Sequence, residues 1–252
     1  MLVTNILCGL TKSVYSVRVW RSCSLLCLIL LQLMLTESLM ALPNTPGIHD
    51  IKLETSVGEV YVTLSVPELA GDEVIPLVLV LHYAGQPTPH YGRPLIEYLM
   101  LPAFEQTKAI FVAPTSLGGD WKQADNRTAI FEMLEALEQE FHTDETRRVV
   151  AGYSMGAIGT WHLACDNPDY FQAAIPIAGF PQALPECKTP IYTILSDSDE
   201  VFSFQNFEQT KDNSAGLERP LGVVKGAGHY DITAFTSALK DAVIWLEELW
   251  KR

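Results

Sequence analysis

The chain has 252 residues, of which 48% are hydrophobic and 19% are charged. This hydrophobic content excludes an intrinsically disordered chain, and the length suits one domain or two small ones. The formal net charge is −13, with 30 acidic against 17 basic side chains. That balance excludes a general nucleic-acid binder, because such proteins present a basic face to the phosphates.

The first forty residues have the order of a secretory signal, in which basic residues precede an apolar run and then small residues. The apolar run, residues 25–35, is 11 residues long, shorter than the roughly 20 that a membrane-spanning helix needs. We therefore expect residues 1–40 to be an export segment, with an uncleaved anchor or a buried helix as the alternatives. The expected product is a periplasmic or secreted domain of residues 41–252, without stable membrane insertion. Its two cysteines, Cys165 and Cys187, form either one disulfide or two buried thiols.

The remainder of the chain alternates apolar runs with segments of helical periodicity. The expected strands are residues 51–53, 60–64, 76–82, 109–113, 148–152, 173–177, 191–195 and 221–224. The expected helices are residues 94–106, 128–141, 157–165 and 233–250. Strands separated by helical segments predict one α/β domain, with a mostly parallel central sheet and helices on both faces. In such sheets, ligands bind beyond the carboxyl ends of the strands.

A nucleophile motif follows the strand at residues 148–152. Gly152-Tyr153-Ser154-Met155-Gly156 has the pattern G-x-S-x-G and lies between a buried strand and a helix. In that setting the glycines permit a sharp turn that presents the serine hydroxyl, and the helix N-terminus favours a developing oxyanion. A glycine-rich turn with an ordinary capping serine has the same pattern. The interpretation of Ser154 as a nucleophile therefore depends on whether a base and an acid accompany it.

The base and the acid are sought after the serine, because α/β hydrolases use the chain order serine, acid, histidine. Of six histidines, His229 alone follows every candidate acid, and it ends the glycine-rich sequence 226–229. The acid must hold this histidine in one tautomer. Asp199 is the preferred candidate after the strand at 191–195, Asp197 is the alternative, and Glu200 is third.

The oxyanion hole requires two backbone N–H groups. One is expected from Met155, directly after the serine, and the other from Tyr83 or Ala84 after the strand at 76–82. Ring side chains on loops at the same edge are candidate substrate contacts, with ordinary loop packing as the alternative for each. These are Tyr83, His90, Trp121, Phe202 and Tyr230, with Tyr91 and Phe204 beside them. The sequence has no metal-ligand cluster, and no metal or organic cofactor is expected.

From about Pro76 onward, the chain resembles the α/β-hydrolase superfamily, in particular small serine esterases. The similarity is most specific at residues 149–179, VVAGYSMGAIGTWHLACDNPDYFQAAIPIAG. It is closest to the branch with phospholipase/carboxylesterases and polyhydroxybutyrate-depolymerase-like or feruloyl-type esterases. The resemblance implies Ser154 as nucleophile, Asp199 as acid and His229 as base. The sequence departs from that branch at Tyr83 and Ser196, where relatives usually have glycine.

The resemblance implies a serine carboxylic-ester hydrolase that forms an acyl-enzyme. Short acyl, aromatic or carbohydrate esters are the expected substrates, either as small molecules or linked to a polymer. Only about ten residues, 180–189, lie where lipases often insert a lid, so we expect no cap domain. A serine peptidase of the same fold, a thioesterase and a non-catalytic binding domain are the alternatives.

Overall fold

The computed structural model describes residues 42–71, 73–211 and 219–252. The expected export segment, residues 1–40, lies outside these ranges. Within them, the chain from Leu42 to Arg252 forms one unit. None of the helices in the described ranges is long and apolar enough to cross a membrane.

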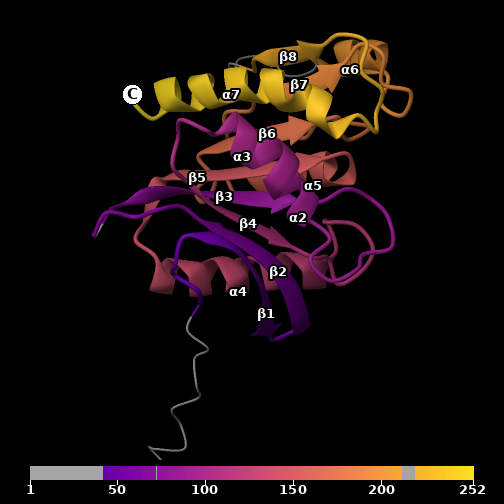
Figure 1. Ribbon diagram of the computed structural model, residues 1–252. Helices are drawn as coiled ribbons and strands as arrows, with labels where there is room; N and C mark the ends of the chain where they lie inside the picture. Colours follow the sequence, from indigo (N-terminus) through magenta and orange to yellow (C-terminus); the bar gives the residue numbers. More distant parts are fainter. Residues whose placement is uncertain (1–41, 72, 212–218) are drawn as a thin grey trace, which may run out of the picture. The chain divides into compact units, whose positions relative to one another are not determined.

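Eight strands form one sheet in the order β1-β2-β4-β3-β5-β6-β7-β8 (Figure 1). The pairs β1–β2 and β2–β4 are antiparallel, and every later pair in the sheet is parallel. The mostly parallel sheet predicted from the sequence is therefore confirmed. The strands are β1 (Gly47–Thr55), β2 (Gly58–Val66), β3 (Ile75–Leu81), β4 (Ile110–Pro114), β5 (Thr143–Tyr153), β6 (Ala173–Ile177), β7 (Thr193–Ser196) and β8 (Leu221–Val224).

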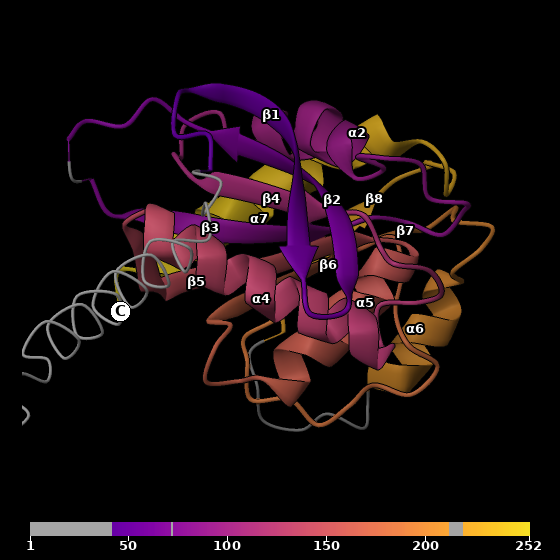
Figure 2. The same ribbon diagram turned by 90° about the horizontal axis from the view of Figure 1, so that it is seen from below.

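Helices cover both faces of the sheet, and Figure 2 shows α4 in front of it and α7 behind it. One face carries α4 (Ala124–Glu140), α5 (Met155–Asp166) and α6 (Phe204–Lys211). The other carries α2 (Arg93–Leu95), η1 (Ile96–Met100), α3 (Leu101–Ala103), η2 (Ile232–Phe235) and α7 (Thr236–Leu249). Strand β3 serves both cores, because Leu77 and Leu79 pack in the first and Val78 and Val80 in the second. Its unbroken apolar sequence follows from this two-sided burial.

Two helical segments differ from the sequence-based prediction. The helix expected at 94–106 is divided into α2, the π-helical η1 and α3, and it ends at Ala103. Pro102 explains the irregularity, because proline has no N–H for the helical ladder and its ring crowds the preceding turn. Helix α6 was not predicted; Phe204, which we expected on a loop, is its first residue.

The connection from β6 to β7 is tied to the end of α5. Cys165 and Cys187 form a disulfide with a Cα–Cα distance of 4.5 Å. The Thr189 hydroxyl donates to the carbonyl of Ala164 at 2.9 Å. Residues 178–192, which join the two strands, contain no inserted helix or strand. Because α5 also begins at the candidate nucleophile, these links hold its far end in place.

Candidate active site

Ser154 occupies a sharp turn between β5 and α5. Its backbone has φ 58° and ψ −115°, a conformation that costs free energy in any residue other than glycine. A side chain at Gly156 would overlap the carbonyl of Leu81 on β3, and one at Gly152 would overlap the carbonyl of Gly156. The two glycines therefore let the start of α5 approach the sheet and raise Ser154 at the carboxyl end of β5.

Three side chains form a continuous hydrogen-bonded row. Ser154 Oγ lies 2.9 Å from His229 Nε2, and His229 Nδ1 lies 2.8 Å from Asp199 Oδ2. They follow β5, β8 and β7, respectively, and their exposed fractions are 9%, 4% and 8%. When Nδ1 donates to the carboxylate, Nε2 is left to accept the serine proton. The row can therefore remove a proton from the hydroxyl and hold the resulting imidazolium beside a carboxylate.

The two candidate acids lie in different surroundings. Asp199 Oδ1 accepts the N–H groups of Val201 at 2.8 Å and Phe202 at 2.7 Å, which leaves Oδ2 for the imidazole. Asp197 instead accepts the N–H of Gly226 at 2.8 Å and faces Lys225 Nζ at 3.2 Å. These two contacts hold the pKa of Asp197 below its usual range. Of the two, only Asp199 touches the histidine ring.

The loop with Asp199 also binds the backbone of the loop with His229. The Ser196 hydroxyl donates to the carbonyl of Ala227 at 2.6 Å and accepts the N–H of Ser198 at 3.1 Å. The third candidate acid, Glu200, accepts the N–H of His229 at 2.8 Å and so contacts its backbone rather than its ring. Ser196, one of the two departures from the family pattern, thus supplies a link that a glycine would lack.

The start of the candidate oxyanion loop is fixed by a buried histidine. His82 is 1% exposed; its Nδ1 donates to the Tyr83 carbonyl at 2.7 Å and its Nε2 accepts the N–H of Ser116 at 3.0 Å. Burial lowers its pKa to about 4, which keeps the ring neutral. Because carbonyl and N–H point in opposite directions across a trans peptide, the N–H of Ala84 points away from this ring. Met155, the first residue of α5, has no acceptor for its N–H within the helix.

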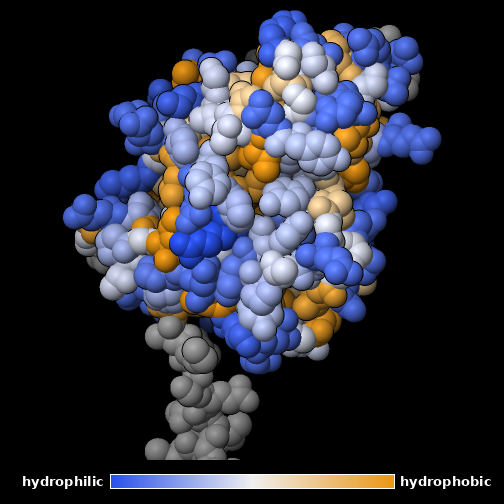
Figure 3. Space-filling view, turned by 45° about the vertical axis from the view of Figure 1, so that its right-hand side comes forward, coloured by the Kyte–Doolittle hydropathy of each residue, from blue (hydrophilic) through white to orange (hydrophobic). Residues whose placement is uncertain are grey.

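Two of the expected substrate contacts flank the histidine. The ring of Phe202 lies 5.5 Å from the His229 ring, and the ring of Tyr230 lies 5.2 Å from it. Tyr230 is 79% exposed, whereas Phe202 is half-buried. Tyr83 is also half-buried, and its ring packs 5.2 Å from that of Tyr91. Figure 3 brings the right-hand side of Figure 1 forward and shows hydrophobic patches among hydrophilic residues on that face.

Two other expected contacts, Trp121 and His90, pack against neighbouring side chains or backbone. Trp121 is 2% exposed, and its indole N–H donates to the His82 carbonyl at 2.9 Å, so it belongs to the core. His90 Nδ1 lies 3.6 Å from Asp50 of β1, and its ring packs against Tyr61 of β2. Strands β4 and β3 separate β2 from the strand of the serine. The burial of Trp121 contradicts its expected role, whereas His90 as a substrate contact stays a prediction.

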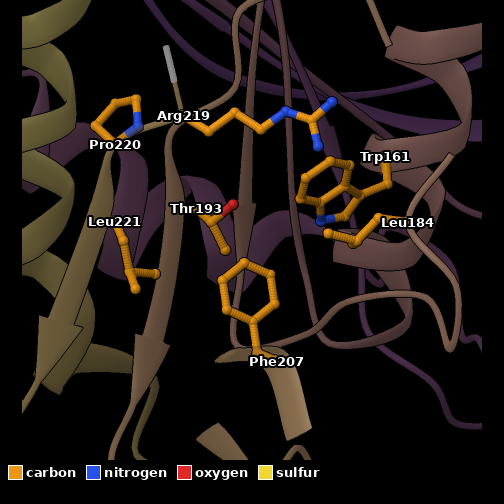
Figure 4. A pocket seen from close by; sticks show the side chains of 7 residues that line it. All are labelled: Trp161, Leu184, Thr193, Phe207, Arg219, Pro220 and Leu221. Carbon is orange, nitrogen blue, oxygen red and sulfur yellow. The ribbon is translucent and has the colours of Figure 1, made fainter. Parts of the chain in front are cut away.

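A separate pocket lies between α5, α6 and the last two strands, and Figure 4 shows its lining. The lining residues are Trp161, Leu184, Thr193, Phe207, Arg219, Pro220 and Leu221. None of the three hydrogen-bonded side chains lines this pocket. Within the described ranges, no group of three or more His, Cys, Asp or Glu residues is placed to hold a metal ion.

Sequence comparison relates the chain to esterases. A family model named Esterase, with the description "Putative esterase", matches residues 111–246. The chain is 26% identical over 138 residues to an Aspergillus niger protein named "Probable feruloyl esterase C". This match covers 53% of the chain and 49% of that protein. The chain thus spans about half the length of the first curated relatives it matches.

Several solved structures have a fold similar to that of this chain. The apoenzyme of S-formylglutathione hydrolase (FrmB) from Staphylococcus aureus has a TM-score of 0.63 at 15% identity, covering 79% of this chain and 98% of that one. A feruloyl esterase module from Clostridium thermocellum, an S954A mutant complexed with sinapinate, has a TM-score of 0.62 at 16% identity. That match covers 81% of this chain and 90% of the module. At these identities the likeness shows the fold alone, which is that of α/β hydrolases.

Proposed function

This chain belongs to the esterase family of the α/β-hydrolase superfamily, and from that premise we propose that it is a serine carboxylic-ester hydrolase. The observation that carries the proposal is the row from Ser154 through His229 to Asp199, with separations of 2.9 and 2.8 Å. A hydroxyl is a poor nucleophile without a base, and this row supplies one. The row lies at the carboxyl edge of the parallel strands, where ligands bind in such sheets.

In the proposed acylation step, Ser154 Oγ attacks the ester carbonyl carbon while His229 Nε2 takes its proton. The electrons of the carbonyl bond move to the carbonyl oxygen. That oxyanion is stabilised by the N–H of Met155 and by a second N–H from Tyr83 or Ala84, with Ala84 favoured by its direction. Asp199 stabilises the imidazolium. When the oxyanion collapses, the bond to the leaving oxygen breaks and His229 returns the proton to the departing alcohol.

In the proposed deacylation step, water replaces the alcohol. His229 takes a proton from the water as its oxygen attacks the acyl carbon, and the same N–H groups hold the second oxyanion. The bond to Ser154 Oγ then breaks, and the serine regains its proton from His229. The products are a carboxylic acid and the free enzyme, and every proton in the cycle is carried by the histidine.

The proposed substrates are short acyl, aromatic or carbohydrate esters, either small or linked to a polymer. The feruloyl esterase names of the relatives support an aromatic acyl group. Phe202 and Tyr230 beside His229 offer ring faces to such a group or to a sugar. We further propose that the protein acts after export, as a periplasmic or secreted enzyme.

The test is hydrolysis of p-nitrophenyl esters of increasing acyl length and of feruloyl esters. Replacing Ser154 with alanine removes the attacking oxygen, and we expect activity to fall by at least about a thousandfold. Glu135→Ala, an exposed change on α4, is the matched control. Hydrolysis that survives Ser154→Ala would refute the mechanism, and cleavage of peptides without cleavage of esters would favour a peptidase.

A further inference from the structure

Both backbone polar groups of His229 are held by side chains. Its N–H donates to Glu200 Oε2 at 2.8 Å, and its carbonyl accepts the hydroxyl of Tyr153 at 2.7 Å. The two partners come from different strand ends, since Tyr153 ends β5 and Glu200 follows β7. Neither contact involves the imidazole, so both leave its two nitrogens to Asp199 and Ser154.

The sequence around His229 gives it little rigidity of its own. It follows Gly226, which has φ 71°, and Gly228, so the loop backbone has access to many conformations. The imidazole must nevertheless keep Nε2 within hydrogen-bond distance of the serine, and a displacement of about 1 Å is costly to a reaction. The position of the ring follows from the position of its backbone, which these two contacts fix.

Each partner is the chain neighbour of another member of the row. Tyr153 immediately precedes Ser154, and Glu200 immediately follows Asp199. The backbone of the base is therefore bound to the segment of the nucleophile on one side and to the segment of the acid on the other. A shift of any one of the three segments would strain a hydrogen bond to another. The two contacts therefore keep the three segments in fixed positions relative to one another.

The surroundings of both groups suit these contacts. Tyr153 is 2% exposed, and its ring packs edge-on against Phe235 at 5.4 Å, which fixes the direction of its hydroxyl. Burial, reinforced by the charge of Asp199, raises the pKa of Tyr153 far above its usual value and keeps the donor protonated. The His229 N–H lowers the pKa of Glu200, so this acceptor is ionised near neutral pH.

We propose that Tyr153 and Glu200 are positioning residues that hold the two backbone groups of His229 and so align its imidazole between Asp199 and Ser154. This inference rests on the proposed function for its effect on turnover. The alignment of the His229 imidazole that it describes can be measured separately from ester hydrolysis.

Three substitutions test separately the hydroxyl of Tyr153, the acceptor oxygen of Glu200 and the charge of Glu200. Tyr153→Phe keeps the packed ring and removes only the hydroxyl. Glu200→Ala removes the acceptor, whereas Glu200→Gln keeps an acceptor oxygen and removes the charge. The matched controls are Tyr98→Phe, at a tyrosine 59% exposed on η1, and Glu135→Ala on the outer side of α4.

The kinetic readout is the separate effect of each substitution on kcat and on KM for a p-nitrophenyl ester. We expect kcat to fall about fivefold in Tyr153→Phe and between about tenfold and a hundredfold in Glu200→Ala. Glu200→Gln should stay within about threefold of the unmodified enzyme. KM should change less than about twofold throughout, because neither side chain is proposed to touch substrate.

The second readout is the far-downfield proton NMR signal of the hydrogen on His229 Nδ1, which reports the bond to Asp199 without any substrate. In Tyr153→Phe and Glu200→Ala this signal should broaden or shift, and it should be unchanged in both controls. Circular dichroism identifies any variant that fails to fold. Tyr153→Phe, which keeps the packed ring, then carries the comparison with the unmodified enzyme.

Several results would overturn the proposal. One is an unchanged kcat together with an unchanged proton signal in the double variant Tyr153→Phe/Glu200→Ala. Equal losses in Glu200→Gln and Glu200→Ala would also overturn it, because charge rather than the acceptor would then matter. If the unmodified protein hydrolyses no ester, the proposed function fails, while the proton signal still decides whether these residues position the histidine.

Discussion

At the scale of single residues, the two acids after β7 show how neighbouring carboxylates take different tasks. Asp199 is bound by two backbone N–H groups and points its second oxygen at the imidazole. Asp197 lies nearer the surface and holds Gly226 of the histidine loop. In the sequence the two acids are two residues apart and follow the same strand, β7. Only the conformation of the turn decides which of them reaches the His229 ring.

Replacing each acid separately tests this division. In the proposed mechanism, Asp199→Asn removes the charge that stabilises the imidazolium and favours the wrong histidine tautomer, so we expect kcat to fall by about a thousandfold or more. Asp197→Asn keeps an acceptor for the Gly226 N–H, and we expect kcat within about threefold of the unmodified enzyme. Steady-state hydrolysis of a p-nitrophenyl ester measures both, and the reverse order of effects would assign the acid to Asp197.

At the scale of elements, the strand–turn–helix unit from β5 to α5 sets the position of the candidate nucleophile. The unit works because α5 starts against the Leu81 carbonyl of β3, where Gly156 leaves room. Ser154 itself adopts a positive φ of 58°, which its neighbours must stabilise. Its N–H donates to the carbonyl of Ile177 on β6 at 2.9 Å, so the turn is also bound to the strand on the other side of β5 from β3.

Gly156→Ala tests the close approach of α5 to β3. The added methyl group would overlap backbone atoms that cannot move cheaply, and we expect a loss of about 3 kcal/mol or more in the free energy of unfolding. Gly71→Ala is the control, because that position has φ 62° but open space around it, and about 1 kcal/mol is expected. Urea unfolding measures both, and similar losses would show that the overlap is relieved.

At the scale of the whole molecule, the buried neutral His82 couples stability to pH. Its pKa is about 4 in the folded protein, below the value near 6.5 expected when the chain unfolds. Between these two values the unfolded chain binds a proton that the folded protein does not. The stabilisation is therefore complete above about pH 6.5 and is lost as the pH falls toward 4.

His82→Gln removes this titration while keeping an acceptor and a donor. From pH 7 to pH 5, His82 should lower the free energy of unfolding of the original protein by about 2 kcal/mol. The variant should lack this contribution and show a correspondingly flatter dependence. Urea unfolding at both pH values gives the comparison, and parallel curves for the two proteins would show that His82 titrates normally.

Much of the fold and of the site was predictable from local pattern. The buried strands β3 and β6 are continuous apolar runs, and the G-x-S-x-G motif marks its own strand–helix turn. Helix α6 was missed because its eight residues carry too few apolar positions to show a helical period. Trp121 was assigned to the substrate side because a loop tryptophan has the same sequence whether its ring faces inward or outward.

The sequence by itself determined the α/β class, the order of the motif residues along the chain and the residue types that the proposed acyl transfer uses. These follow from short-range periodicity and from glycines that a tight turn requires. Only the tertiary structure decided which acid meets His229, where His90 and Trp121 point, and that Tyr153 and Glu200 hold the histidine backbone. Such contacts join residues 29 to 76 positions apart. They depend on the order of the strands in the sheet, which no local pattern encodes.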